Sequence, residues 1–184
     1  VRTVVDFGHK TLNIISCLLL LLAFSCNTVS DKMPKQTTEA DREQINTTLD
    51  QFNEAAANAD FGKYFDFFAE EGVFIGTDAT ENWDKKNFMS WAKPHFDKKK
   101  TWHFKSMDRH IYFYQADGKL AWFDELLNTQ MKICRGSGVL IKQGDKWKIQ
   151  QYVLSMTIPN EYTDTVIKIK APIEDILIQK RSKK

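Results

Sequence analysis

Residues 102–158 read WHFKSMDRHIYFYQADGKLAWFDELLNTQMKICRGSGVLIKQGDKWKIQQYVLSMTI. Aromatic and β-branched residues recur throughout this segment, and an Asp-Gly pair and a Gly-Asp pair interrupt it like tight hairpin turns. Consecutive strands joined by such turns pair antiparallel. The pattern therefore predicts four long strands, at residues 102–115, 119–130, 131–143 and 146–158.

Three helices are predicted before these strands, at residues 41–59, 61–69 and 85–96, with a short strand at 73–75. In the first and third helices, apolar residues recur at spacings of three and four, so they share one face. These residues are Ile45, Leu49, Phe52 and Ala56, and Phe88, Trp91, Ala92 and Phe96. Helices followed by a run of hairpins predict an α+β domain, with a curved antiparallel sheet of about four long strands and three N-terminal helices packed on one face.

The first 25 residues have the pattern of a signal peptide. Arg2, His9 and Lys10 precede an apolar run over residues 14–24, which is too short to span a bilayer. The run ends in Ala23-Phe24-Ser25-Cys26, which resembles the bacterial lipoprotein cleavage box.

That resemblance implies cleavage before Cys26 and acylation of its thiol. Residues 26–40 are then a polar tether, and the protein is exported and membrane-anchored on the periplasmic or cell-surface face. The alternative is an ordinary cleaved signal and a secreted soluble protein.

Composition and motifs exclude several classes of function. The chain has 184 residues, 42% hydrophobic and 27% charged, and a net charge of +2 that is too small to predict nucleic-acid binding. Apart from Cys17 and Cys26 the only cysteine is Cys134, so the domain has no internal disulfide. The histidines lack metal-ligand spacing and no nucleotide motif is present, so neither a metal nor a cofactor is expected.

Four strings in the chain look familiar together: AWFDE at 121–125, RGSGVL at 135–140, WKIQQYVLS at 147–155 and IPNE at 158–161. Their order resembles the SnoaL-like branch of the nuclear-transport-factor-like superfamily over residues 41–161, which leaves residues 162–184 as a C-terminal extension. The resemblance implies a cone with a pocket between sheet and helices, and often a homodimer through the sheet. Some members are cyclases or isomerases, whereas others only bind or assemble, so the fold leaves the function open.

Two adjacent carboxylates are the candidate general bases. Asp124 and Glu125 lie on one predicted strand, so their side chains point to opposite faces, with Trp122 beside Asp124 and Phe123 beside Glu125. Whichever carboxylate enters an apolar pocket gains a raised pKa by desolvation, which suits acid–base catalysis.

Arg135 is the expected partner of the buried carboxylate, in a structural ion pair. Alternatively it holds an anionic group of a ligand. Ser137, between two glycines, marks a bulge or a close approach of ligand or backbone. Tyr152 either donates a hydrogen bond into the cavity or is a core residue with a satisfied hydroxyl.

Two further residues could contact a ligand. Asp78 lies in a loop that also carries Trp83, and it either lines the pocket mouth or stabilises a turn. Trp102 is either a core residue or part of a cavity wall.

The leading hypothesis is that the domain binds a small apolar or anionic-apolar molecule in its cone. An alternative is a cofactor-free cyclase, isomerase or hydratase that uses Asp124 or Glu125 as its base. A third is a dimeric interaction module without a small-molecule ligand. The C-terminal extension carries alternating isoleucines that either form a helix or lie along the domain.

Overall fold

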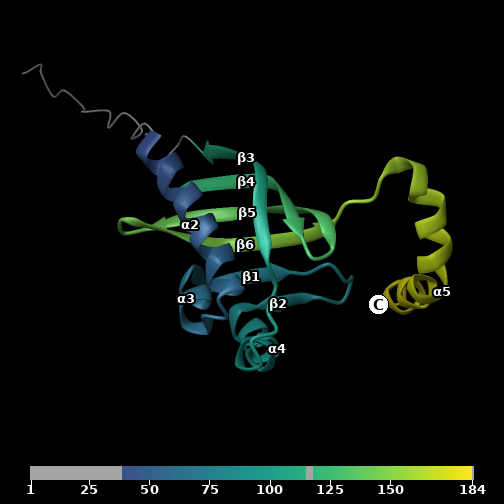
Figure 1. Ribbon diagram of the computed structural model, residues 1–184. Helices are drawn as coiled ribbons and strands as arrows, with labels where there is room; N and C mark the ends of the chain where they lie inside the picture. The colour runs from purple at the N-terminus through teal and green to yellow at the C-terminus, as the bar shows by residue number, and fades with distance from the viewer. Residues whose placement is uncertain (1–38, 115–117, 184) are drawn as a thin grey trace, which may run out of the picture. The chain divides into compact units, whose positions relative to one another are not determined.

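A computed structural model of the protein describes residues 39–114 and 118–183. The predicted signal peptide, the lipidation site Cys26, nearly all of the tether and Asp117 lie outside the described residues. The described chain folds into helices and strands in the order α2, α3, β1, β2, α4, β3, β4, β5, β6, α5, with a short 3-10 helix before α5 (Figure 1).

The strands form one mixed six-stranded sheet in the order β2-β1-β6-β5-β4-β3. Neighbouring strands are antiparallel except that β1 runs parallel to β6. The bounds are β1 Phe68–Ile75, β2 Asn82–Asp84, β3 Phe104–Tyr114, β4 Leu120–Thr129, β5 Lys132–Gln143 and β6 Lys146–Met156. The predicted α+β class and the four long strands are confirmed.

The expectation of a purely antiparallel sheet of about four strands is wrong at one edge. β1 begins at Phe68, inside the segment predicted as helix, and continues through Gly72 to Ile75. Its register on β6 shifts between Phe68 and Val73. β1 is long because it pairs with β6, which is distant in sequence, and local periodicity carries no sign of that pairing.

The middle hairpin turns at Gln130 and Met131, at the junction between the predicted strands 119–130 and 131–143. The hydroxyl of Thr129 accepts a hydrogen bond from Met131 N at 2.9 Å and donates one to Lys132 O at 2.9 Å. Lys132 has a φ of 69°, and Gly144 at the next turn has a φ of 61°. Left-handed backbone is easiest for glycine, so Lys132 is held there by the turn's side-chain hydrogen bonds.

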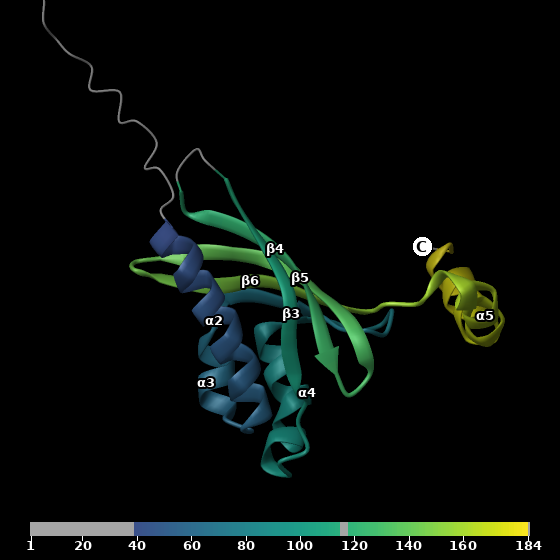
Figure 2. The same ribbon diagram turned by 45° about the horizontal axis from the view of Figure 1, so that its top comes forward.

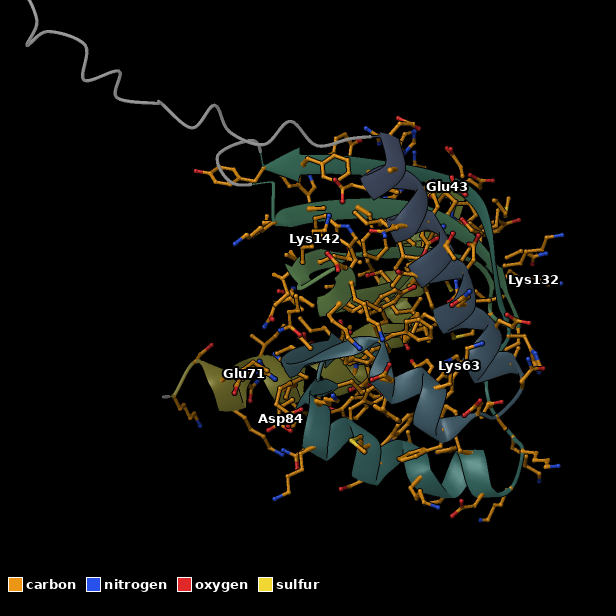
Figure 3. The ribbon with its side chains drawn as sticks, turned by 90° about the vertical axis from the view of Figure 1, so that its left-hand side faces the viewer. Glu43, Lys63, Glu71, Asp84, Lys132 and Lys142 are labelled. Carbon is orange, nitrogen blue, oxygen red and sulfur yellow. The ribbon has the colours of Figure 1, made fainter. Side chains whose placement is uncertain are left out.

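Helices α2 (Glu39–Ala57), α3 (Phe61–Asp66) and α4 (Lys85–Asp97) pack on the same face of the curved sheet (Figures 1 and 2). Two of them begin at an aspartate that accepts a backbone hydrogen bond. Asp60 accepts from Lys63 N at 3.0 Å, and Asp84, labelled in Figure 3, accepts from Asn87 N at 2.7 Å. Such caps satisfy donors that a helix leaves free at its first turn.

The first turn of α2 is fixed to the β5–β6 hairpin by a buried aspartate. Asp41 is 8% exposed and forms an ion pair with Lys142, whose side chain is labelled in Figure 3. It also accepts a hydrogen bond from Trp147 Nε1 at 3.3 Å. These contacts join the start of α2 to β5 and β6, the last two strands in the chain. They therefore hold the helix layer against the sheet.

Aromatic side chains fill most of the space between helices and sheet. Phe52 of α2 stacks on Tyr64 of α3 at 4.4 Å between ring centroids, and Phe74 of β1 stacks on Phe88 of α4 at 4.1 Å. Tyr152 of β6 lies parallel to Phe74 at 5.8 Å. These rings are buried, so the deep part of the expected cone is core.

The C-terminal extension forms a 3-10 helix, Asn160–Tyr162, followed by α5, Thr163–Arg181. No residue of α5 is buried, and its isoleucines are exposed. Of the two sequence-based alternatives, the helix is the one observed. Across residues 39–114 and 118–183, no helix combines the length and apolar character that crossing a bilayer requires.

Candidate functional site

A small pocket remains at the edge of the aromatic core, and we call it the aromatic pocket. Its volume is about 170 Å³. β1, the β1–β2 loop, β2, α4, the segment before β3, the β4–β5 turn and β6 all contribute to its wall. The lining residues are Phe74, Gly76, Thr77, Glu81, Trp83, Phe88, Trp91, Trp102, Phe104, Gln130, Met131 and Leu154.

Three tryptophans dominate the wall of the aromatic pocket. Trp83 and Trp91 stack with ring centroids 4.9 Å apart, and Trp91 lies 6.1 Å from Trp102. Phe88 at the base is within 6.3 Å of all three rings, with interplanar angles of 8° to 21°. The planes of Trp83 and Trp91 differ by 27° and those of Trp91 and Trp102 by 31°. The wall therefore offers flat, polarizable surface rather than a network of hydrogen-bonding groups.

Glu81 is the only ionisable residue among those that line the aromatic pocket in the described structure. Its Oε2 accepts a hydrogen bond from Asp78 N at 3.2 Å, and its carbonyl accepts one from Gly76 N at 3.0 Å. A Cβ at position 76 would lie 2.1 Å from Glu81 Oε2, so glycine lets the carboxylate lie close over the loop.

A second polar cluster lies deeper, where β3, β4 and α2 meet. Glu125 is 1% exposed, and its Oε2 accepts a hydrogen bond from Arg109 Nε at 2.8 Å and forms an ion pair with Nη2, also at 2.8 Å. Nη2 also contacts Asp50 Oδ1 at 2.8 Å, and Nη1 donates to the carbonyl of Asn46 at 3.1 Å. All three guanidinium nitrogens are therefore engaged, and Glu125 is a neutralised buried charge.

Tyr152 joins this cluster from β6. Its hydroxyl donates to Glu125 Oε1 at 3.4 Å. Burial raises the pKa of Glu125 from its ordinary value, and the charge and hydrogen bonds of Arg109 oppose that rise. Burial also raises the pKa of Tyr152 well above its ordinary value, and the negative charge of Glu125 adds to the effect.

The raised pKa of Glu125 predicts a pH dependence of stability. A carboxyl with a higher pKa in the folded state contributes stability that is complete below its unfolded pKa and is lost as pH rises through its folded pKa. Glutamate in an unfolded chain has a pKa of about 4.3. The difference in free energy of unfolding between wild type and Glu125→Gln should therefore fall as pH rises from about 4 toward neutrality. Urea unfolding at several pH values measures this difference; an increase with pH would show that Arg109 outweighs burial.

The structure separates Asp124 and Glu125 as their adjacency predicts. Glu125 and Phe123 face the core, whereas Asp124 and Trp122 lie on the opposite face, which we call the outer face of the sheet. Asp124 Oδ1 lies 3.4 Å from His110 Nδ1 there.

The expectation that Arg135 pairs with the buried carboxylate is wrong. Arg135 lies opposite Leu126 in the β4–β5 register, so its side chain belongs to the outer face and is exposed. Arg109 takes that place because it lies opposite Glu125 on β3. A single arginine could be assigned to the wrong strand because only the cross-strand register distinguishes the two positions.

The remaining predicted ligand-binding residues are spread over different parts of the molecule. Trp102 lines the aromatic pocket, and Ser137 lies opposite Asp124 on the outer face. Asp78 stabilises the β1–β2 loop by accepting hydrogen bonds from Thr80 N at 2.8 Å and Thr80 Oγ1 at 2.6 Å. These bonds lower the pKa of Asp78 from its ordinary value.

Several residues of the site escaped the sequence reasoning. The sequence predicts Trp83 as a loop residue and Trp91 as a helix-face residue, and it gives no prediction for Glu81 or Arg109. The signal that could have found the tryptophans is their rarity: three of the chain's five lie between positions 83 and 102.

The outer face carries an exposed aromatic pair. Tyr112 and Trp122, on β3 and β4, stack at 5.7 Å with an interplanar angle of 17°. Val139 lies next to Trp122 in the register, and Leu120 and Tyr114 form the next exposed pair. Contiguous exposed apolar surface of this kind is typical of a protein contact site.

No group of three or more histidine, cysteine, aspartate or glutamate side chains that could hold a metal ion occurs in the described part of the chain.

The model of the SnoaL-like domain family matches residues 45–159, which is more than half of the chain. No curated protein matches. Among solved structures, a domain of unknown function with a cystatin-like fold from Nostoc punctiforme superposes with a TM-score of 0.57 at 15% identity, covering 79% of this chain and 99% of that one. An NTF2-like protein of unknown function from Pseudomonas putida superposes with a TM-score of 0.54 at 14% identity, covering 68% of this chain and 92% of that one.

A candidate dehydratase of the NTF2-like family from Streptomyces avermitilis gives a TM-score of 0.55 at 16% identity, covering 66% of this chain and 99% of that chain. At these identities the similarity to solved structures shows the fold alone. The fold and the match over residues 45–159 agree on the superfamily that the sequence strings indicated. The chain therefore belongs to the SnoaL-like domain family.

Proposed function

We propose that this domain binds a small apolar ligand, about the size of one ring, in the aromatic pocket, without chemical turnover. The observation that supports the proposal most is the pocket itself: three tryptophans around about 170 Å³ of space. A dry cavity of about 150 Å³ is large enough to bind benzene, whereas sites for drug-sized ligands measure about 300–1,000 Å³. The volume therefore fits one ring rather than a polycyclic skeleton.

The state of Glu125 supports binding over catalysis. A general base needs access to the proton that it abstracts. Glu125 is covered, and its charge is neutralised by Arg109. Asp124 lies on the outer face, away from the aromatic pocket. Catalysis by either residue is the less supported alternative, and turnover that is lost in Glu125→Gln or Asp124→Asn would revive it.

Substituting Trp91 tests the proposed binding. Trp91 is 41% exposed, so Trp91→Ala should fold while losing one wall of the aromatic pocket. We expect benzyl alcohol to bind wild type and to bind Trp91→Ala up to about tenfold more weakly, because an aromatic pair is worth about 0.5–1.5 kcal/mol beyond the area that it buries. Isothermal titration measures both affinities.

Trp122→Ala is the matched control for Trp91→Ala, because Trp122 is 42% exposed but lies on the outer face. Its affinity for benzyl alcohol should equal that of wild type. Equal binding by Trp91→Ala and Trp122→Ala, or no binding by wild type, would remove the aromatic pocket as the site and favour an interaction module without a ligand.

We also propose that two copies associate through the outer face, with Tyr112 and Trp122 at the contact. Their stacked rings and the neighbouring Val139 supply the apolar surface that a self-association site needs. Trp122→Lys should convert a dimer to a monomer in sedimentation analysis, because it places a charge in the buried centre of the interface. Trp91→Ala is the control and should stay dimeric; a monomeric wild type would refute the proposal.

The export of the protein stays a proposal based on residues 1–26. We propose that Cys26 carries a lipid that holds the domain at a membrane surface. Cys26→Ala should move the protein from the membrane fraction to the soluble fraction. Wild type found wholly in the soluble fraction would instead indicate the secreted alternative.

A further inference from the structure

We propose that the ligand of the aromatic pocket is an organic cation, such as an alkylated ammonium group carried on a small apolar body. This inference rests on the proposed function, because it assigns a charge to the ligand of that same pocket. Two independent features of the wall carry it: the tryptophan rings and the lone carboxylate of Glu81.

The faces of aromatic rings attract cations, and tryptophan does so most strongly, when the charge lies within about 6 Å of the ring centroid. Along the wall, the ring centroid of Trp91 lies 4.9 Å from that of Trp83 and 6.1 Å from that of Trp102. In a pocket of about 170 Å³, a bound ammonium group is therefore held near more than one of these rings. An apolar wall also covers the alkyl groups that surround the charge of a quaternary amine.

Among the described residues that line the pocket, Glu81 alone carries a formal charge, and that charge is negative. Oε2 of Glu81 accepts one hydrogen bond, from Asp78 N at 3.2 Å. No lysine, arginine or histidine side chain lies within ion-pair distance of Glu81 in residues 39–114 and 118–183. The carboxylate is therefore not neutralised by the described protein, unlike Glu125, and a cationic ligand would supply the missing partner.

The same wall disfavours an anion. Neither Arg109 nor Arg135 lines the pocket, since Arg109 is engaged by Glu125 and Asp50 and Arg135 lies on the outer face. An anionic ligand would meet electron-rich ring faces and the charge of Glu81 with no basic lining residue to offset them. The wall of the aromatic pocket therefore favours a cationic ligand over the anionic-apolar ligand that was one of the sequence-based hypotheses.

Three probes of the same shape isolate the charge. Choline is a cation, 3,3-dimethylbutan-1-ol is its neutral isostere, and 3,3-dimethylbutanoate is a related anion. We expect choline to bind the full-length protein about tenfold more tightly than the alcohol, and the anion to bind more weakly than either. Titration calorimetry at low ionic strength measures all three affinities.

Glu81→Gln and Glu71→Gln provide the variant and its matched control. Glutamine keeps the oxygen that accepts the Asp78 hydrogen bond, so Glu81→Gln should fold normally. The substitution should lower the affinity for choline about three- to tenfold and leave the affinity for 3,3-dimethylbutan-1-ol unchanged. Glu71, labelled in Figure 3, is exposed on β1 and does not line the pocket, so its glutamine variant should bind all three probes like wild type.

The outcomes separate this inference from the function beneath it. Choline binding that exceeds alcohol binding and falls only in Glu81→Gln supports the cation. If the alcohol binds as tightly as choline or more tightly, the proposal of a cationic ligand is wrong, but the proposal that the aromatic pocket binds a ligand stands. Binding of none of the three probes, together with no binding of benzyl alcohol, overturns both.

Discussion

Arg109→Met is expected to lower the free energy of unfolding by about 3–5 kcal/mol, because it leaves the buried carboxylate of Glu125 without its partner. Arg109 is 7% exposed in its side chain, and its guanidinium also holds Asp50 and the backbone of Asn46. The substitution therefore removes contacts that join β3 to both β4 and α2. Urea denaturation at neutral pH measures the change.

A double variant and a control separate the charge effect from lost packing. Arg109→Met combined with Glu125→Leu should recover much of the loss, since a buried ion pair replaced by apolar side chains of similar size is often neutral. Asp50→Asn removes only the exposed partner, which is 65% accessible, and should change stability by less than about 1 kcal/mol. If Arg109→Met lowered the free energy of unfolding no more than Asp50→Asn does, the buried carboxylate of Glu125 would not require Arg109 as its partner.

Phe88→Ala is expected to have a similarly large effect, about 3–5 kcal/mol of destabilisation, and to enlarge the aromatic pocket. Phe88 is fully buried and stacks on Phe74 at 4.1 Å. It also forms the base of the aromatic pocket beneath Trp83 and Trp91. Removing the ring therefore joins its volume to the space in which we propose that a ligand binds.

Two measurements test Phe88→Ala. Thermal or urea unfolding should show the loss of stability, while Met107→Ala, at a site 57% exposed, should stay within about 0.5 kcal/mol of wild type. The variant should also bind 1-naphthylmethanol, a two-ring alcohol, more tightly than wild type does. Wild type that already prefers the two-ring alcohol would show that the pocket is larger than one ring.

The long strands and the helix faces could be predicted from the sequence because both depend on local patterns. Runs of aromatic and β-branched residues separated by turn residues predict β3 to β6, and the spacing of Ile45, Leu49 and Phe52 predicts α2 and its buried face. Asp124 and Glu125 were also separated correctly, because adjacent strand residues must point to opposite faces.

What the sequence could not supply was the pairing of distant segments. The parallel contact of β1 with β6 turned part of a predicted helix into strand, and the register of β3 on β4 chose Arg109 over Arg135 as the partner of Glu125. The aromatic pocket is of the same kind. Its tryptophans come from β2, α4 and the segment before β3, and only the tertiary fold brings them together.

We propose that ligand binds in the aromatic pocket and not at Glu125 or on the outer face. The five tryptophans allow one direct measurement, a titration with benzyl alcohol followed through the five indole N–H signals in NMR. We expect the signals of Trp83, Trp91 and Trp102 to shift together with one dissociation constant, while those of Trp122 and Trp147 stay fixed. Shifts confined to Trp122, or no shift of any of the five signals, would show that benzyl alcohol does not bind in the aromatic pocket.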